Sequence, residues 1–229
     1  MLAFVLAVIG GVVGEELAIV LTGAHADAKG NIPVTAPILV GVVVGQYGVW
    51  LAWMALVSHR KGTGSLHLDF GFFVDPARDW WLVFAGSGFA LLAGLLLAPL
   101  SSLDKGKSQD VVDQLTSSHG AKRAVLILTA IVVAPAIEEL FFRGLLLRSL
   151  LRRFSSPVAV VIAAVCFAFV HFAIDPSIAQ IAVQPALVAL GVLSGYFAVR
   201  TGNLSRSVLL HAGFNLLAVV TGVAILTIR

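Results

Sequence analysis

The amino-acid sequence predicts an all-α protein, a polytopic bundle of transmembrane helices, and two observations carry this prediction. Of the 229 residues, 59% are hydrophobic and 12% are charged, and that charged share is roughly half the share in an average soluble domain. The apolar residues also form runs of about 20, the length of a helix that spans a bilayer. These features exclude a soluble globular enzyme, a disordered chain and a coiled coil. With Cys166 as the single cysteine, they also exclude a disulfide scaffold.

The apolar runs predict seven spans in a single membrane domain of residues 1–229. The first contains Glu15 and Glu16 and lacks the basic leader of a signal peptide, so we interpret it as a retained helix. The segment 101–120 is polar, and residues 110–115 predict a short helix at the membrane surface. The predicted spans are 2–22, 34–57, 80–100, 122–148, 157–174, 178–199 and 207–228.

The distribution of basic residues predicts the orientation and excludes one class of partner. Eight Lys and Arg residues fall on the side of the N-terminus and six on the other side, which favours a cytoplasmic N-terminus. The net charge is +3, and the basic residues lie at the ends of apolar segments, where lipid headgroups account for them. We therefore expect no nucleic-acid partner.

The span 122–148 differs from the others because it carries charges near its middle. Ionisable groups inside a span cost about 2.5–3.5 kcal/mol on insertion scales, which makes them candidate functional groups. Glu139 and Arg143 are four residues apart on the helix and are predicted to form an ion pair. Glu138 lies about 100° away around the helix, with no basic residue in register. We therefore expect chemistry at Glu138 and a supporting role for Glu139 and Arg143.

Pro135 precedes these carboxylates and has no backbone N–H. We expect it to leave the carbonyl of Ile131 without a helical partner and to open the helix locally.

Two later spans carry imidazole groups. His171 lies near the end of 157–174, and His211 and Asn215 share one face of 207–228, with Ser207 one turn earlier. A polar stripe on an apolar helix points toward the interior of a bundle. Hydrogen bonding between helices would also explain these residues, because such bonds contribute about 0.6–2 kcal/mol in membranes.

These side chains suit hydrolysis in two ways. Glu138 can take a proton from water beside His171, while His211 and Asn215 donate to a developing oxyanion. Equally, Glu138, His171 and His211 can hold a divalent metal such as zinc and leave one position open for water. Cys166 lies about 140° from His171 around its helix, and we interpret it as a packing residue.

The sequence resembles the CAAX-protease and bacteriocin-processing (CPBP, Abi) family of intramembrane endopeptidases over residues 121–225, whereas 1–120 fits only in topology. Three motifs carry the resemblance, in the order Glu-Glu-x-x-x-Arg, Phe-x-x-x-His and His-x-x-x-Asn. They stand here as Glu138-Glu139 with Arg143, Phe167 with His171, and His211 with Asn215. The resemblance implies that Glu138 is the catalytic base, that His171 lies with it at the water, and that His211 and Asn215 lie at the oxyanion.

The implied function is cleavage of a peptide bond in a membrane-embedded or lipid-anchored peptide or protein. The expected location is the cytoplasmic membrane of a prokaryote. Two other functions fit the same pocket: a non-catalytic membrane binding or immunity protein, and a proton-coupled transporter. Glu15 and Glu16 imitate the first motif but have Val20 in place of the arginine, so we do not expect them to act in catalysis.

Overall fold

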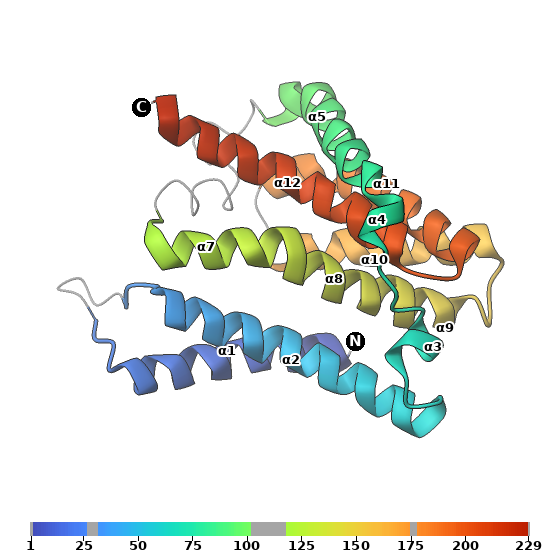
Figure 1. Cartoon of the computed structure of the whole chain (residues 1–229), viewed down its shortest axis with the longest axis horizontal. Helices are drawn as coiled ribbons and strands as arrows, with labels where there is room; N and C mark the ends of the chain where they lie inside the picture. Colours follow the sequence, from blue (N-terminus) through green and yellow to red (C-terminus); the bar gives the residue numbers. More distant parts are fainter. Residues whose placement is uncertain (1, 27–31, 102–117, 175–177, 229) are drawn as a thin grey trace. The chain divides into compact units, whose positions relative to one another are not determined.

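The computed structural model describes residues 2–26, 32–101, 118–174 and 178–228, and the regular elements within these ranges are all helices (Figure 1). The all-α fold class is therefore confirmed. Each predicted span corresponds to a helix with similar bounds. These helices are α1 (Leu2–Thr22), α2 (Ala36–Lys61), α5 (Trp81–Ser101), the continuous helix Gly120–Leu150, α10 (Ser156–Ile174), α11 (Ile178–Thr201) and α12 (Ser205–Ile228).

Within the described ranges, four helices are long and apolar enough to cross a membrane: Leu2–Thr22, Ala36–Lys61, Gly120–Leu150 and Ile181–Thr201. The apolar helices Trp81–Leu97 and Ser156–Phe172 are shorter. Several long apolar helices are consistent with an integral membrane protein. The helix α12 is not among these six, so the count of seven spans stays a prediction. The surface helix expected at 110–115 lies outside the described residues.

The chain forms two compact units, of which the first contains α1, α2 and α7 (Gly120–Leu128). In this unit α1 and α2 run side by side in opposite directions (Figure 1). The backbones of the two helices are in direct contact because glycines of α1 face glycines of α2. A Cβ atom added to Gly14 would collide with the carbonyl of Gly41, and one added to Gly10 would collide with the carbonyl of Gly45. Small residues at a helix contact are typical of membrane bundles. Glu15 and Glu16 lie on α1.

The second unit contains the remaining elements, and α12 packs in it against both α5 and α11, while α10 packs on α11. Gly213 of α12 faces Val83 of α5, and a Cβ there would fall on the Val83 carbonyl. Gly191 of α11 lies in the same way against Ala164 of α10. These contacts set α10, α11 and α12 close enough for their side chains to meet.

Two short helices, α3 (Leu66–Phe70) and α4 (Pro76–Asp79), hold one end of the second unit together. Arg148 donates from Nη1 to the carbonyl of Asp69 and from Nη2 to that of Gly202, at 3.2 and 2.7 Å. The backbone N–H of Leu204 donates to the carbonyl of Gly71, which has φ +68°, a conformation natural to glycine. The turn between α11 and α12 is thereby fixed to the segment after α3.

The first turn of α12 is tied to α4 through Asp79, whose side chain is buried. The carboxylate accepts hydrogen bonds from Arg78 at 2.7 and 3.2 Å and from Nε of Arg206 at 3.3 Å. The hydrogen bonds from Arg78 lower the pKa of Asp79 from 3.8 to about 2, against the opposing effect of burial. Ser205 Oγ accepts a hydrogen bond from the backbone N–H of Asp75 at 2.9 Å. These contacts fix the start of the helix that carries His211.

Candidate active site

The helix Gly120–Leu150 is irregular where its charges lie. It changes from α7 to the π-helix η1 (Thr129–Val133), then to α8 (Ala134–Glu139), to a second π-helix η2 (Leu140–Leu147) and to α9 (Arg148–Leu150). Wide π turns in otherwise α-helical segments are frequent at functional sites. Glu138 and Glu139 therefore end the short α-helical segment between two π turns, and Arg143 lies in the second turn.

The helix is widened into a π turn just before Pro135, where a local opening was expected. In a π-helix each carbonyl pairs with the N–H five residues on, and for Ala130 that residue is Pro135, which has none. The side chain of Asn215 on α12 donates from Nδ2 to the Ala130 carbonyl at 2.9 Å. The freed carbonyl expected at Ile131 stays a prediction.

Glu139 and Arg143 form the predicted ion pair, with Nη1 of Arg143 2.9 Å from Oε1 of Glu139. Both side chains are fully buried. The same carboxylate oxygen lies 2.9 Å from Nδ1 of His211. Glu139 thus connects η2 to α12, and its negative charge compensates a guanidinium that could not otherwise be buried at an acceptable cost.

The ring of Phe167 is buried at the centre of the site. The sequence analysis assigned it no role beyond its place in the second motif. The guanidinium carbon of Arg143 lies over its face, 4.5 Å from the ring centroid. The imidazole rings of His171 and His211 lie against it with centroids 4.6 and 5.4 Å away. This one aromatic ring packs against three polar side chains of the site. A buried phenylalanine four residues before an intramembrane histidine is the signal that could have identified it.

Glu138 lies between two imidazoles. Its Oε2 is 3.8 Å from Nε2 of His171 and 3.9 Å from Nε2 of His211. The Glu138 side chain is 13% exposed and that of His171 29%, so this part of the site is accessible to small molecules.

The hydrogen bonds at Nδ1 fix which nitrogen of each ring carries the proton. His171 Nδ1 lies 2.9 Å from the carbonyl oxygen of Phe167, which can only accept, so Nδ1 donates. His211 Nδ1 lies 2.9 Å from the carboxylate of Glu139, which is paired with Arg143 and also accepts. In singly protonated rings both Nε2 atoms therefore carry lone pairs, and both lie close to the carboxylate oxygen of Glu138.

The structure brings together five of the six predicted side chains: Glu138, Glu139, Arg143, His171 and His211. Asn215 lies one turn after His211 on α12, and its side chain donates to the Ala130 carbonyl of η1. The six side chains come from α8, η2, α10 and α12, and all belong to the second unit. Glu15 and Glu16 belong to the first unit. Cys166 is partly buried on α10.

The predicted metal site at Glu138, His171 and His211 stays a prediction. Within the described ranges, no group of three or more His, Cys, Asp and Glu side chains could hold a metal ion. Glu138, His171 and His211 surround a small space, but we derive no step through a metal.

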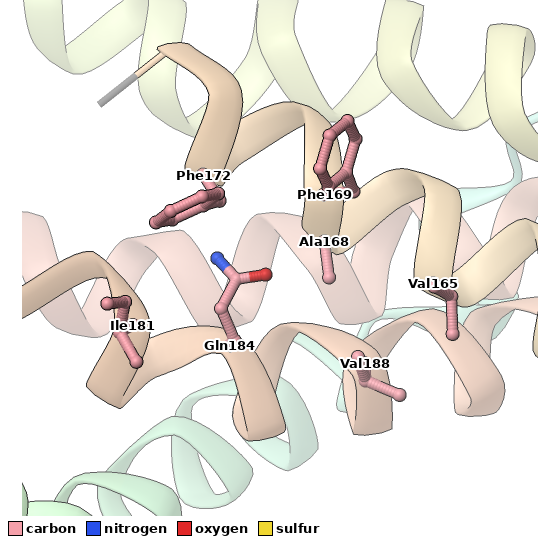
Figure 2. A pocket seen from close by; sticks show the side chains of 7 residues that line it. All are labelled: Val165, Ala168, Phe169, Phe172, Ile181, Gln184 and Val188. Atoms are coloured by element: carbon pink, nitrogen blue, oxygen red, sulfur yellow. The ribbon is translucent and has the colours of Figure 1, made fainter. Parts of the chain in front are cut away.

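A cavity of about 280 Å³ lies between α10 and α11. Figure 2 shows Gln184 among apolar side chains that include Phe169, Phe172 and Ile181. None of its lining residues is ionisable, so it can bind apolar groups but offers no acid or base.

Comparison with protein families gives a match over part of the chain. Residues 120–217 match the family described as "Type II CAAX prenyl endopeptidase Rce1-like". Neither a curated protein nor a solved structure matches the chain. The matched range contains Glu138, Glu139, Arg143, His171, His211 and Asn215. Residues 120–217 of this chain therefore form a domain of the Rce1-like type II CAAX prenyl endopeptidase family.

Proposed function

We propose that the protein is an intramembrane endopeptidase that uses Glu138 to activate water. The observation that carries the proposal is the position of the Glu138 carboxylate between Nε2 of His171 and Nε2 of His211, at 3.8 and 3.9 Å. The family of residues 120–217 supports peptide-bond cleavage as the reaction.

The hydrogen-bonding character of this space supports water as its occupant. The Glu138 carboxylate accepts hydrogen bonds, and so does Nε2 of a singly protonated His171, so a water that donates to both fits beside them. A water molecule has two O–H donors and a lone pair with which to attack a carbonyl carbon. A water held by Glu138 and one histidine is thus fixed in place with its lone pair available to attack the carbonyl carbon.

The reaction follows from these contacts. Glu138 takes a proton as the water oxygen bonds to the carbonyl carbon of the scissile peptide. The carbonyl oxygen becomes an oxyanion. The C–N bond then breaks, and the proton held by Glu138 passes to the leaving nitrogen. One water is consumed, and the products are a carboxylic acid and an amine, which become a carboxylate and an ammonium when the acid proton passes to the amine.

The oxyanion requires donors, and we assign this role to Asn215 and His211. Asn215 Nδ2 has two hydrogens, of which one is used by the Ala130 carbonyl. His211 Nε2 can donate only when the ring carries a second proton, because Nδ1 is already bonded to Glu139. Glu139 then faces the cationic ring as the aspartate does in a serine-protease triad.

The substrate we propose is a membrane-embedded or lipid-anchored peptide or protein. The site lies on helices within the family domain, among long apolar helices, so a substrate must enter from the bilayer. The apolar cavity between α10 and α11 would accommodate an apolar side chain or a lipid chain of such a substrate. We propose the cytoplasmic membrane of a prokaryote as the location, with the N-terminus cytoplasmic.

The experiment is cleavage by purified protein in lipid vesicles that contain a mixture of prenylated and unmodified membrane peptides. Products are identified by mass spectrometry. The proposal predicts products with wild type and with Glu16→Gln, a matched change on α1 of the first unit, and none with Glu138→Gln. Equal cleavage by Glu138→Gln would contradict it. A folded wild-type protein that binds peptides but cleaves none would favour a binding or immunity protein.

A further inference from the structure

A second cavity, of about 340 Å³, lies at one end of the second unit, between the end of the helix Gly120–Leu150 and the end of α11. Its apolar lining residues are Leu147, Leu151, Ala198, Val199 and Leu204. Two arginines also line it. The side chain of Arg143 is fully buried and paired with Glu139, so Arg148 is the cation that a ligand in this cavity can reach.

The guanidinium of Arg148 is held in place by neutral groups. Nη1 donates to the main-chain carbonyl of Asp69 at 3.2 Å and Nη2 to that of Gly202 at 2.7 Å. Gly71 packs directly against it, since a Cβ atom added there would collide with Nη2. A guanidinium has five N–H donors, of which these bonds use two. Arg148 is therefore fixed, but its charge is not compensated by these contacts.

Exposed arginines lie beside the wall of this cavity. Arg152 directly follows the lining residue Leu151, and Arg200 directly follows the lining residue Val199. Both arginines are exposed. Within the described ranges, neither of them nor Arg148 forms an ion pair with an acidic side chain. This end of the cavity therefore carries positive charge that an anion from outside the protein can compensate.

The position of the cavity along the helices indicates which anion it meets. Gly120–Leu150 and Ile181–Thr201 are both long and apolar enough to cross a membrane, and the cavity lies where both end. The ends of spanning helices lie at the level of the lipid headgroups. Arginine binds phosphate oxygens through two parallel hydrogen bonds, and basic pockets between spans bind anionic headgroups.

We propose that this cavity binds one anionic phospholipid. Its phosphate pairs with Arg148, Arg152 and Arg200, and the first part of an acyl chain lies against the apolar wall. A free phosphate ion would satisfy the arginines but would leave that wall uncovered, so the combination of charge and apolar surface selects a lipid. This site does not involve Glu138, and the proposal stands independently of the peptidase activity. A lipid bound to the folded protein alone would also stabilise it.

The first test compares lipids on the intact protein. Native mass spectrometry of the detergent-solubilised chain measures the affinity of the first bound molecule of phosphatidylglycerol and of phosphatidylcholine with the same acyl chains. We expect phosphatidylglycerol to bind about tenfold more tightly or better, and millimolar inorganic phosphate to leave it bound. Equal affinities for the two lipids would overturn the proposal. Displacement of phosphatidylglycerol by inorganic phosphate would also overturn it, because it would assign the cavity to a free anion.

The second test removes charge without disturbing the fold. Arg152→Gln/Arg200→Gln changes two exposed side chains and should weaken phosphatidylglycerol binding about tenfold. Arg60→Gln/Lys61→Gln is the matched control, because it removes two charges from the exposed end of α2 in the first unit. The control should bind phosphatidylglycerol like wild type. Equal weakening by both double variants would show a general attraction of the basic protein for anionic lipid and would refute a specific site.

The third test fills the apolar wall and keeps every charge. Val199 lines the cavity and is 39% exposed, whereas Val158 on α10 is 46% exposed and lines neither cavity described above. Val199→Trp should weaken phosphatidylglycerol binding several-fold, and Val158→Trp should leave it unchanged. Unchanged binding by a folded Val199→Trp protein would contradict a lipid chain in this cavity.

Discussion

At the scale of single residues, the site depends most on Glu139, because one carboxylate oxygen contacts both Arg143 and His211. We predict that Glu139→Gln abolishes most cleavage. The side-chain amide of glutamine is neutral, so in either orientation it provides no negative charge to stabilise a cationic His211. It should also destabilise the fold by about 3–5 kcal/mol, because Arg143 is left as a buried charge without its partner. Cleavage rates and thermal unfolding in detergent measure the two effects.

The double variant Glu139→Gln/Arg143→Met separates these effects. Removing both charges of a buried pair is far less destabilising than removing one. The unfolding temperature should therefore recover much of its loss while activity stays low. Recovery of activity together with stability would show that Glu139 acts only on folding.

Asn215 gives a second residue-scale prediction. Asn215→Ala should lower kcat about 10²–10³-fold, the usual loss for one oxyanion donor. Ser207→Ala is the matched control, because Ser207 on the same helix makes a buried hydrogen bond to the Ser194 carbonyl at 2.8 Å outside the site. Both variants lose one interhelical hydrogen bond, so only a kcat loss specific to Asn215 supports its role.

At the scale of the elements, the sequence predicts where helices lie better than how they are wound. Apolar runs locate each helix within a few residues because twenty apolar residues have no other stable form in a bilayer. The π turns at Thr129–Val133 and Leu140–Leu147 are not encoded in that pattern. They depend on contacts far away in sequence, such as that between Asn215 and Ala130.

The same distinction applies to the candidate site. The Glu139–Arg143 pair was predictable because four-residue spacing on one helix brings side chains together. The contact of Glu139 with His211 was not, because it joins α8 to α12 and depends on how these helices pack. The sequence identified Phe167 only as one position of a motif. Its packing against Arg143, His171 and His211 depends on how the helices fold together.

The contact between α4 and α12 through Asp79 gives a prediction about the pH dependence of stability. The pKa of Asp79 is lowered to about 2 from its ordinary 3.8, so the stabilisation is complete above the ordinary value and is lost as the pH falls toward 2. Asp79→Asn should destabilise the protein by about 1–3 kcal/mol at neutral pH, because it loses charged hydrogen bonds from Arg78 and Arg206.

Thermal unfolding of wild type and Asp79→Asn from pH 7 to pH 2 tests this. The difference between the two unfolding temperatures should stay constant down to about pH 5 and then shrink towards zero as Asp79 is protonated. A difference that persists at pH 2 would mean that the amide perturbs packing rather than charge.

At the scale of the whole molecule, the proposed reaction uses Glu138 and the two histidines with no step through a metal ion. The proposal therefore predicts that EDTA and 1,10-phenanthroline leave the cleavage rate unchanged. Loss of activity on chelation, restored by zinc and absent in His171→Ala, would instead support a metal held by Glu138, His171 and His211.

The central claim is that water, activated by Glu138, attacks the peptide carbonyl directly. The most direct measurement is a single turnover in H₂¹⁸O with enzyme in excess over a membrane peptide, read by mass spectrometry. The account predicts that every new C-terminal carboxylate carries one ¹⁸O and that Glu138→Gln gives no product. Product that carries only ¹⁶O would show that an enzyme carboxylate forms the bond to carbon, and would contradict the account.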